Sequence, residues 1–337
     1  MDKIDKKLLL VVDQNKAYKS VISVGDIQRY LIKTQNLNAS IKDVLRVKIR
    51  VAQSSREIKE IKAEMLKFRM EFMPILDEDN VLVDVVFWED LFEEKYIANE
   101  GNLEIPVIIM AGGKGTRLKP ITNVIPKPLI PLGDKTILER IIDRFLVSGA
   151  KHFYLSVNYK SEMIQNYFSE LKEKKYQINF FEENKPLGTA GSLSLLTNKI
   201  NSTLFVSNCD ILIDQDFEKM YQYHLENKNE LTLIGALKTS HIPYGILEVG
   251  KDNLLKEIKE KPELNFMVNT GVYIIEPHVL NEIPKDTFFH ITHLMEKIIK
   301  RNGRVGVFPI GENSWMDVGN WSEYNETLKK LGETPFV

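Results

Sequence analysis

The chain has 337 residues, of which 43% are hydrophobic and 27% are charged, as in an ordinary soluble globular protein of about two domains. The formal net charge is only −2, so the chain carries no overall basic field, which argues against nucleic acid as its main partner. No apolar run approaches the ~20 residues that span a bilayer, and no signal-peptide pattern opens the chain, so we expect no membrane partner.

A single cysteine, Cys209, excludes an intrachain disulfide and favours a reducing compartment. It adjoins Asp210 in an apolar strand, which predicts a small core residue and not a nucleophile. These features together predict a cytoplasmic protein.

Residues 1–97 contain one pattern twice. In the first copy two strands, 8–13 and 20–24, flank a DQN turn, and a helix begins at Asp26. Residues 72–94 repeat the order of strand, turn, strand and helix around a DEDN turn. Between the copies, Ile58, Ile61, Met65 and Phe68 recur at helical spacing and predict an amphipathic helix.

This repeat resembles a pair of CBS domains, which often bind adenosine or guanosine ligands beside enzymes. In that family the ribose is held by the Asp of a [ST]-x-x-D turn, which implies Ser23 and Asp26 in the first copy. The second copy has Phe87 and Asp90 at these positions, which puts its site in doubt. The resemblance implies a regulatory nucleotide, and the alternative is a platform for dimerisation.

Residues 98–104, ANEGNLE, are polar and predict a linker. From Ile105 to the end, strands and helices alternate, which predicts a mostly parallel sheet with helices on both faces. Expected strands include 150–158 and 203–212, and the helix expected at 161–174 starts with a serine cap. Sites in such sheets lie beyond the carboxyl ends of the strands.

The stretch 105–142 carries the strongest pattern. A buried strand ends at Met110, and a loop follows whose glycines 112, 113 and 115 leave backbone N–H groups free to approach a polyphosphate. Lys114, Arg117 and Lys127 add cations, and a helix begins near Ile137. The loop fits neither the GxxxxGK[ST] pattern of a P-loop nor GxGxxG, in which Leu118 replaces the third glycine.

The wording GGxGTRLxPxTxxxPKPLxP resembles the signature of the sugar-1-phosphate nucleotidylyltransferases. The resemblance implies an α/β fold in which a Rossmann-like, mixed and mostly parallel sheet follows the small α/β CBS pair. The predicted domains are therefore 1–97, the linker 98–104, and a nucleotidyltransferase domain at 105–337.

The implied reaction joins a sugar 1-phosphate to a nucleoside triphosphate and releases pyrophosphate. Arg117 would hold the leaving pyrophosphate, Lys127 would lie over the α phosphate, and Lys261 in the EKP turn would pair with the sugar phosphate. Asp210 and Asp317 match the family positions that bind Mg²⁺, a cation that prefers carboxylate oxygens. Mg²⁺ is therefore the expected cofactor.

Nucleotide and sugar contacts follow from the same resemblance. The expected nucleotide-binding residues are Ala111, Gly112, Gly113, Gly115, Thr116, Glu183, Gly188 and Thr189, and the expected sugar-binding residues are Asn158, Gly245, Glu260, Asn269 and Thr270. Glu183 stands where pyrimidine-specific members have a glutamine. A carboxylate can accept from the adjacent N1–H and N2 amino groups of guanine, whereas uracil and thymine offer one N–H between carbonyls, so guanine is favoured.

Taken whole, the chain resembles CBS-fused nucleotidyltransferases, including guanylyltransferases that act on glucosamine 1-phosphate in legionaminic-acid pathways. The expected partners are GTP and a sugar 1-phosphate, and paired CBS modules favour a homo-oligomer. Alternatives are a mannose-1-phosphate guanylyltransferase, a uridylyl-, thymidylyl- or cytidylyltransferase, or a nucleotide-sensing regulatory protein whose catalytic domain has decayed.

Overall fold

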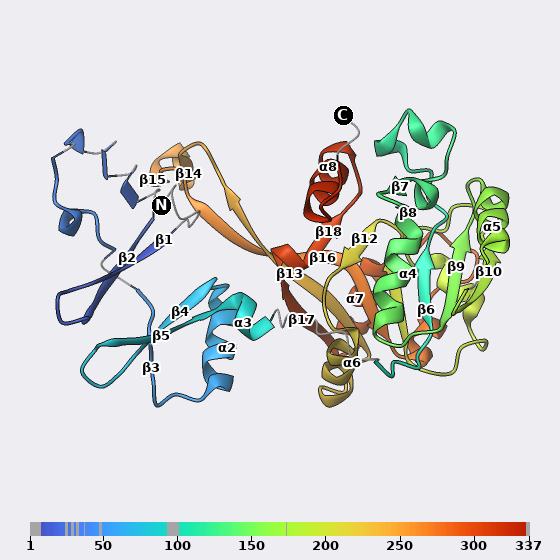
Figure 1. The fold of residues 1–337 in the computed structure, drawn as a ribbon, viewed down its shortest axis with the longest axis horizontal. Coiled ribbons are helices and arrows are strands. Elements are labelled where there is room, and N and C mark those ends of the chain that lie inside the picture. The colour runs from blue at the N-terminus through green and yellow to red at the C-terminus, as the bar shows by residue number, and fades with distance from the viewer. Residues whose placement is uncertain are drawn as a thin grey trace. The chain divides into compact units, whose positions relative to one another are not determined.

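The computed structural model describes residues 8–23, 26–27, 30–31, 34–36, 38–46, 49–92, 101–172 and 174–334. The chain divides into two units (Figure 1): Met1–Glu93 with Leu237–Met267, and Glu94–Ala236 with Val268–Val337. We call them the N-terminal unit and the catalytic unit, the second after the activity that the resemblance of its sequence leads us to expect.

The catalytic unit is built on a seven-stranded sheet. Its order is β10 (Gln177–Glu182), β9 (His152–Val157), β6 (Val107–Met110), β11 (Leu204–Asn208), β16 (Glu263–Ile275), β13 (Leu231–His241) and β17 (Val305–Gly311). Strands β10, β9, β6 and β11 are mutually parallel, and β16 runs antiparallel to β11. The large, mostly parallel sheet that the sequence predicts is confirmed.

Alternation along the central strands divides their side chains between two cores. Val107 and Ile109 of β6 join one cluster with Phe145, whereas Ile108 joins the other with Leu294. Because successive side chains of a strand point to opposite faces, a strand buried on both faces reads as a continuous apolar run. That is why β6 is uniformly apolar.

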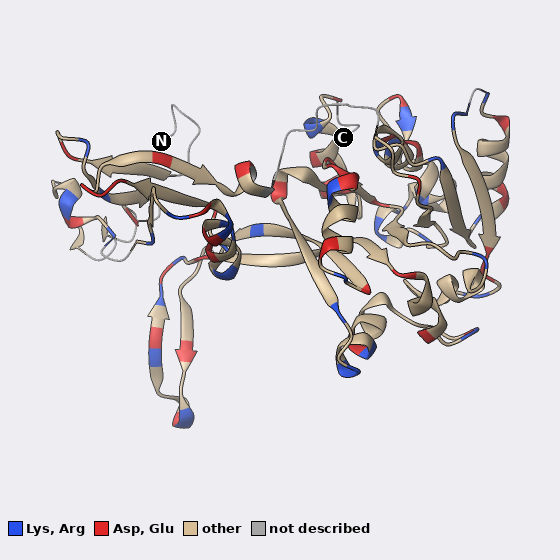
Figure 2. Cartoon of the chain, turned by 90° about the horizontal axis from the view of Figure 1, so that it is seen from below, with Lys and Arg blue, Asp and Glu red and all other residues tan. Residues whose placement is uncertain are grey.

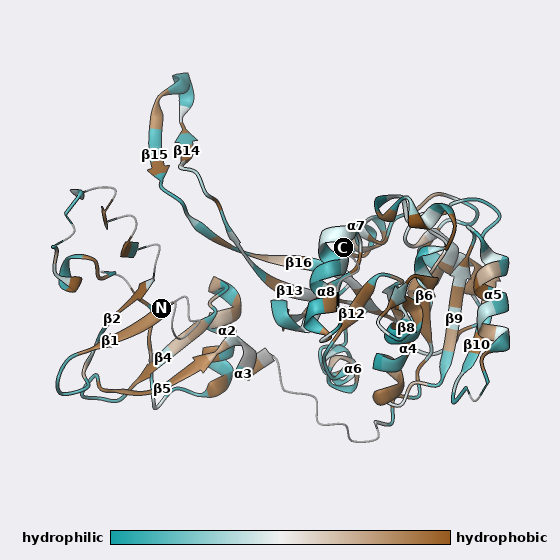
Figure 3. Ribbon diagram, turned by 45° about the horizontal axis from the view of Figure 1, so that its top comes forward, coloured by the Kyte–Doolittle hydropathy of each residue, from teal (hydrophilic) through white to brown (hydrophobic). Residues whose placement is uncertain are grey.

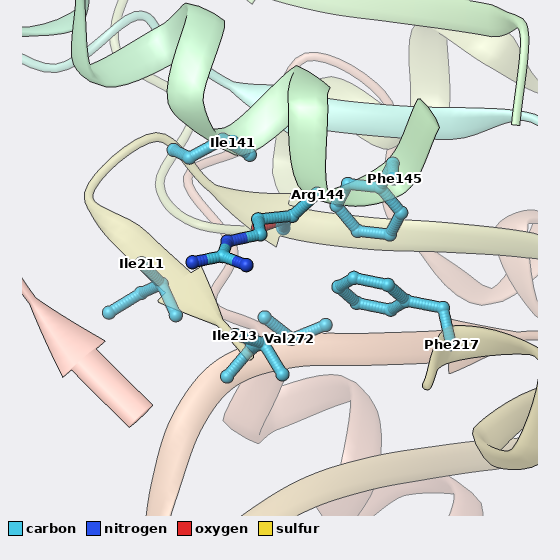
Figure 4. Close-up of a pocket in the computed structure, with 8 residues that line it drawn as sticks. Ile141, Arg144, Phe145, Ile211, Ile213, Phe217 and Val272 are labelled. Carbon is cyan, nitrogen blue, oxygen red and sulfur yellow. The ribbon is translucent and has the colours of Figure 1, made fainter. Parts of the chain in front are cut away.

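Helices cover the two faces of the sheet. They are α4 (Ile137–Val147), α5 (Ser161–Glu170), α6 (Phe217–Glu226), α7 (Ile291–Lys300) and α8 (Trp321–Lys330). Helix α4 begins at a capping box in which Thr136 and Glu139 satisfy each other's backbone N–H groups. Its Phe145 stacks on Phe217 of α6 with ring centroids 3.9 Å apart, as Figure 4 shows.

The short elements of this unit lie mostly in its loops. They are β7 (Pro131–Leu132), β8 (Lys135–Thr136), β12 (Ile211–Ile213), β18 (Trp315–Asp317) and the 3₁₀ turns Thr116–Leu118, Ile121–Asn123, Lys127–Leu129, Gly191–Leu196, Pro277–Glu282 and Glu312–Ser314. Strands β12 and β18 pair antiparallel, with Ile211 opposite Asp317. This pairing fixes the Asp317 turn beside the end of β11.

The N-terminal unit contains β1 (Leu8–Val12) paired with β2 (Tyr18–Ser23), the turn Ile41–Asp43, and a sheet of β3 (Ala52–Gln53), β4 (Phe72–Leu76) and β5 (Leu82–Phe87). Helices α2 (Ile58–Phe68) and α3 (Trp88–Phe92) complete it. The predicted helix at Asp26 falls partly outside the described residues.

The internal repeat is confirmed at the level of hydrogen bonds. Asp13 accepts from the N–H groups of residues 15 and 17, and Asp77 accepts from those of 79 and 81. The N–H group of Ser23 donates to Asp26 at 2.8 Å, and that of Phe87 donates to Asp90 at 3.0 Å. Two copies of one motif therefore build this unit, while its assignment as a CBS pair stays a prediction.

The division into units differs from the predicted boundaries in one segment. Residues Leu237–Met267 belong with the N-terminal residues, because Leu237 and Met267 pack in a core with Met65, Met73 and Trp88. This segment includes the hairpin of β14 (Ile246–Val249) and β15 (Leu255–Lys259), with the turn Lys251–Asn253 (Figure 3).

Three local expectations also change. Of the predicted linker 98–104, the described part is packed: Leu103 is buried and its N–H donates to Ser148. Helix α5 has no serine cap, since Lys160 with φ 53° occupies the cap position and Ser161 starts the helix. The predicted strand 203–212 divides into β11 and β12 around a turn at Cys209 and Asp210.

Charge and hydropathy agree with the composition. Figure 2 shows acidic and basic residues interspersed along the described chain. Among the described residues, no helix is both long and apolar enough to cross a membrane.

Candidate functional site

A pocket of about 450 Å³ lies at the carboxyl ends of β6 and β11, in the catalytic unit. Its lining residues come from the glycine loop, the ends of these strands, and the segments that precede the 3₁₀ turn Gly191–Leu196 and helix α7. They are Met110, Gly112, Gly113, Gly115, Thr116, Arg117, Lys127, Glu183, Pro186, Leu187, Gly188, Thr189, Asn208, Cys209, Asp210, Phe288, His290 and Gly319.

The glycine loop forms one side of this pocket. Gly115 has φ 61°, and a Cβ there would lie 2.9 Å from Thr122 Cγ2 and 3.0 Å from Lys127 Cβ. At Gly113, by contrast, a Cβ would meet nothing within 4 Å. The loop is therefore tight at Gly115, where it approaches Lys127, and open at Gly113. Backbone at such a loop can approach a phosphate closely.

Lys127 and Asp210 form the charged floor. Lys127 is only 5% exposed, and its Nζ lies 2.5 Å from Asp210 Oδ2. Arg117 is exposed and lies 3.8 Å from the same oxygen. A buried lysine needs a counter-charge in the free protein. A bound triphosphate would supply further negative charge to both cations.

Asp317 adjoins Asp210 through the backbone, since the N–H of Val318 donates to the Asp210 carbonyl at 2.9 Å. Burial and the nearby Asp210 carboxylate raise the pKa of Asp317 to about 6. Two neighbouring carboxylates suit a divalent cation such as Mg²⁺. This cation takes one or two carboxylate ligands from a protein and completes its coordination with water and phosphate oxygens. The assignment of Asp210 and Asp317 as Mg²⁺ ligands stays a prediction.

Glu183 is buried at the opposite side, beside Gly112. Its Oε1 accepts from Ser156 Oγ at 2.5 Å and its Oε2 from the N–H of Leu187 at 3.0 Å. Each carboxylate oxygen can accept a second hydrogen bond. Glu183 therefore fixes the loop before Gly188 and still lines the pocket.

Several residues that line the pocket were not among the predicted site residues. Phe288 and His290 come from the segment before α7, which joins the pocket only through long-range pairing: the N–H of Phe289 donates to the Leu187 carbonyl at 2.8 Å. Met110 and Asn208 end their strands at the pocket, and the rule that sites follow strand ends could have found them.

Other predicted residues have structural partners. Asn158 Nδ2 donates to the Glu183 carbonyl, and Asn269 Oδ1 accepts from the Gly271 N–H and the Tyr273 hydroxyl. Thr270 is 1% exposed, and its hydroxyl donates to the Ile234 carbonyl, so a sugar contact by this side chain is not supported. Ala111 is fully buried and its N–H donates to Ser156.

Gly245, Glu260 and Lys261 belong to the N-terminal unit, where a Cβ on Gly245 would lie 2.9 Å from Glu260 Oε2. In the same unit, Asp26 is buried and accepts from Arg46 Nε at 2.9 Å and Ser23 Oγ at 2.7 Å. Its carboxylate thus has a positive partner already, and the ribose contact stays a prediction.

The structure agrees with the expectation that Cys209 is not a nucleophile. Cys209 is buried, and burial raises the pKa of its thiol to about 12, which makes it a poor nucleophile. Figure 4 shows a second pocket, where Arg144 extends among apolar side chains such as Ile141, Ile213 and Val272. It contains none of the predicted site residues.

The family model described as "Nucleotidyl transferase" matches residues 106–334, more than half of the chain. The chain belongs to the nucleotidyl transferase family. The enzyme class that the glycine loop predicts is thereby confirmed. The match covers the whole pocket, so its lysine, arginine and carboxylates are those of a nucleotidyltransferase domain.

Two similar proteins are mannose-1-phosphate guanyltransferase 2 of Candida glabrata, 30% identical over 226 residues, and the mannose-1-phosphate guanyltransferase of Saccharomyces cerevisiae, 30% identical over 233 residues. Each comparison covers 64% of this chain and 62% of the relative, so the chain spans less than two thirds of these relatives.

Among solved structures, HddC from Yersinia pseudotuberculosis is similar with a TM-score of 0.54 and 27% identity, over 67% of this chain and 99% of that one. HddC complexed with GMP-PN is similar with a TM-score of 0.53 and 26% identity, over the same shares. The nucleotidyltransferase family therefore accounts for the catalytic unit.

Proposed function

We propose that this protein transfers the guanylyl group of GTP to a hexosamine 1-phosphate, with glucosamine 1-phosphate as the first candidate. The products are a GDP-sugar and pyrophosphate, which places the protein in nucleotide-sugar biosynthesis. The observation that carries the transfer is the convergence of the glycine loop, Arg117, Lys127 and Asp210 on one pocket, with the Asp317 turn bonded to the backbone of Asp210.

Guanine is supported by two independent observations. Glu183 presents carboxylate oxygens at the pocket, and a carboxylate matches the paired donors of guanine better than the edge of uracil or thymine. The similar proteins are guanyltransferases, and one similar structure holds GMP-PN. Mannose 1-phosphate is the second candidate acceptor, because the curated relatives carry that sugar in their names.

In the proposed reaction, an oxygen of the sugar phosphate attacks the α phosphorus of GTP. The new P–O bond forms as the bond from that phosphorus to the bridging β oxygen breaks, and the electron pair leaves with pyrophosphate. The glycine loop holds the triphosphate with its backbone, and Lys127 stabilises negative charge that develops at the α phosphate. Arg117, which is exposed and lines the pocket, would hold pyrophosphate.

Asp210 and Asp317 would hold Mg²⁺ in this reaction. The ion would neutralise the phosphate oxygens and make the phosphorus more electrophilic. The Lys127–Asp210 contact keeps both side chains in place before the nucleotide binds. Because the attacking oxygen of the sugar phosphate is already anionic, the reaction needs no protein base and no covalent intermediate.

The sugar-binding residues stay predictions. Gly245, Glu260, Lys261 and Asn269 are proposed for the sugar 1-phosphate on the family resemblance, as is a regulatory nucleotide in the N-terminal unit. A decayed regulatory protein is disfavoured, because Arg117, Lys127 and Asp210 are in contact around one pocket.

Pyrophosphate release with Mg²⁺ tests the proposal. GTP, UTP, dTTP, CTP and ATP are each combined with glucosamine, N-acetylglucosamine, glucose and mannose 1-phosphates. We expect a signal that requires both GTP and a hexosamine 1-phosphate. A signal with UTP or dTTP alone would overturn the guanine assignment, and no signal in any combination would overturn the transferase.

A further inference from the structure

The segment Phe288–His290 forms one wall of the nucleotide pocket together with the segment Pro186–Thr189. Backbone hydrogen bonds join the two: Phe289 donates to Leu187 at 2.8 Å, and Ala190 and Gly191 donate to the Phe289 carbonyl at 3.0 and 3.1 Å. We call the two segments together the paired-loop wall. These hydrogen bonds fix the position of one segment relative to the other.

The paired-loop wall adjoins Glu183, on the side of the pocket away from Arg117 and Lys127, the cations expected to bind the phosphates. Glu183 accepts from the N–H of Leu187, whereas Arg117 and Lys127 both contact Asp210. A triphosphate held by the cations therefore directs its base toward this wall. Gly188 in the wall has φ 82°, and a Cβ there would lie 2.7 Å from the Phe289 carbonyl, so the two segments are in close contact.

His290 has a defined orientation in this wall. Its Nδ1 lies 3.3 Å from Thr189 Oγ1, and that oxygen accepts from the N–H of Ile291 at 3.1 Å. Because the Thr189 oxygen already accepts from the backbone, we assign its hydroxyl proton to a hydrogen bond with Nδ1. The neutral imidazole then carries its own proton on Nε2, the ring nitrogen that Thr189 does not hold.

Phe288 is the second side chain of the wall that the pocket exposes. It is 57% exposed although it is a large apolar residue, and its ring lies edge-on to His290 with centroids 4.8 Å apart. An aromatic ring at the edge of a polar pocket offers a stacking surface for a planar base.

Resting on the proposed function, we infer that His290 and Phe288 recognise the guanine base: His290 Nε2–H donates to the O6 carbonyl, and Phe288 packs on the ring. Glu183 faces the N1 and N2 donors. Adenine, which carries an amino group at position 6, would meet the Nε2–H donor with another donor. His290 therefore discriminates between the purines at position 6, in addition to the discrimination that Glu183 gives at positions 1 and 2.

The test compares kcat/KM for GTP, ITP and ATP in the wild type and in His290→Ala. ITP keeps O6 and lacks the 2-amino group. In His290→Ala we expect kcat/KM to fall about tenfold with GTP and with ITP, and to change little with ATP. The loss should arise mainly from a higher KM, because a contact with the base is made equally in the bound ground state and in the transition state. His290→Gln, which keeps a donor, should recover part of the loss.

His278→Ala is the matched control, since His278 is exposed, pairs with Glu230, and does not line the pocket. Phe288→Ala should raise KM for the three purine nucleotides by similar factors, and Phe288→Tyr should not. An unchanged GTP-to-ATP ratio in His290→Ala, with GTP still preferred by the wild type, would overturn this inference alone. A wild type that prefers UTP or dTTP would overturn it together with the proposed function.

Discussion

At the residue scale, the site depends on a lysine that is almost fully buried. Lys127 lies in the PKP sequence after a proline-rich loop, is 5% exposed, and contacts Asp210 at 2.5 Å. A cation in this position is held at low conformational cost, so it can stabilise developing charge without rearranging. Arg117 and Lys127 could be predicted because both belong to one long motif, whereas Asp210 was predicted from its place at a strand end that matches a family position.

Lys127→Ala is expected to lower kcat by about a hundredfold or more, since it removes a pre-positioned cation from the reacting phosphate. Pyrophosphate release measures the loss. Lys119→Ala, on the exposed face of the same loop, should retain nearly full activity. Equal losses in the two variants would contradict a specific role for Lys127.

Asp317 gives a prediction about the metal. Chelation of divalent cations should abolish turnover, and added Mg²⁺ should restore it. Asp317→Asn should lower turnover strongly and raise the Mg²⁺ concentration for half-maximal rate by about tenfold or more, because one carboxylate ligand is lost. A variant with the wild-type Mg²⁺ dependence would show that Asp317 does not bind the ion.

His224 provides a prediction about stability and pH. Burial lowers the pKa of His224 below its ordinary value of 6.5, although Glu276, 3.0 Å away, opposes the shift. Below about pH 6.5 the unfolded chain takes up a proton that the folded protein resists, so the free energy of unfolding should fall as the pH falls.

His224→Gln can keep the contacts with Thr232 and Glu276 and cannot titrate. Its melting temperature should therefore fall less than that of the wild type between pH 7.5 and 5.5. His152→Gln, exposed on β9, is the control and should follow the wild type. The same pH dependence in all three proteins would contradict the assignment to His224.

At the scale of elements, the sequence predicted most helices and strands of the catalytic unit but not how its loops meet. The capping box of Thr136 and Glu139 and the apolar run of β6 are local patterns, so they could be found. The contact of Phe288 and His290 with the Gly188 loop arises from pairing between residues about 100 positions apart. Nothing in the local spacing of either segment predicts that contact.

Gly188→Ala tests the paired-loop wall as an element. The change forces a non-glycine residue to φ 82° and places a Cβ 2.7 Å from the Phe289 carbonyl, so the free energy of unfolding should fall by about 1–3 kcal/mol. Gly113→Ala, with nothing within 4 Å of its Cβ, should cost much less. Chemical denaturation measures both, and equal losses would mean that the wall is not tightly packed.

At the scale of the whole molecule, the two-unit organisation was predictable and the path of the chain was not. The repeat in residues 1–97 is visible because both copies keep the same aspartate turns. The return of Leu237–Met267 to the N-terminal unit is not visible, since Leu237 continues an apolar strand that begins in the catalytic unit. When domain boundaries are predicted from the order of elements along the chain, such a segment is assigned to the domain that precedes and follows it.

The central claim is that this chain makes a GDP-sugar, and the identity of the product tests it most directly. The wild type is incubated with GTP, Mg²⁺ and glucosamine 1-phosphate, with Lys127→Ala as the matched blank, and the products are separated and their masses measured. We expect GDP-glucosamine and pyrophosphate in equal amounts from the wild type, and almost none of either product from the variant. Formation of a UDP- or dTDP-sugar from the corresponding triphosphate, with no product from GTP, would contradict it.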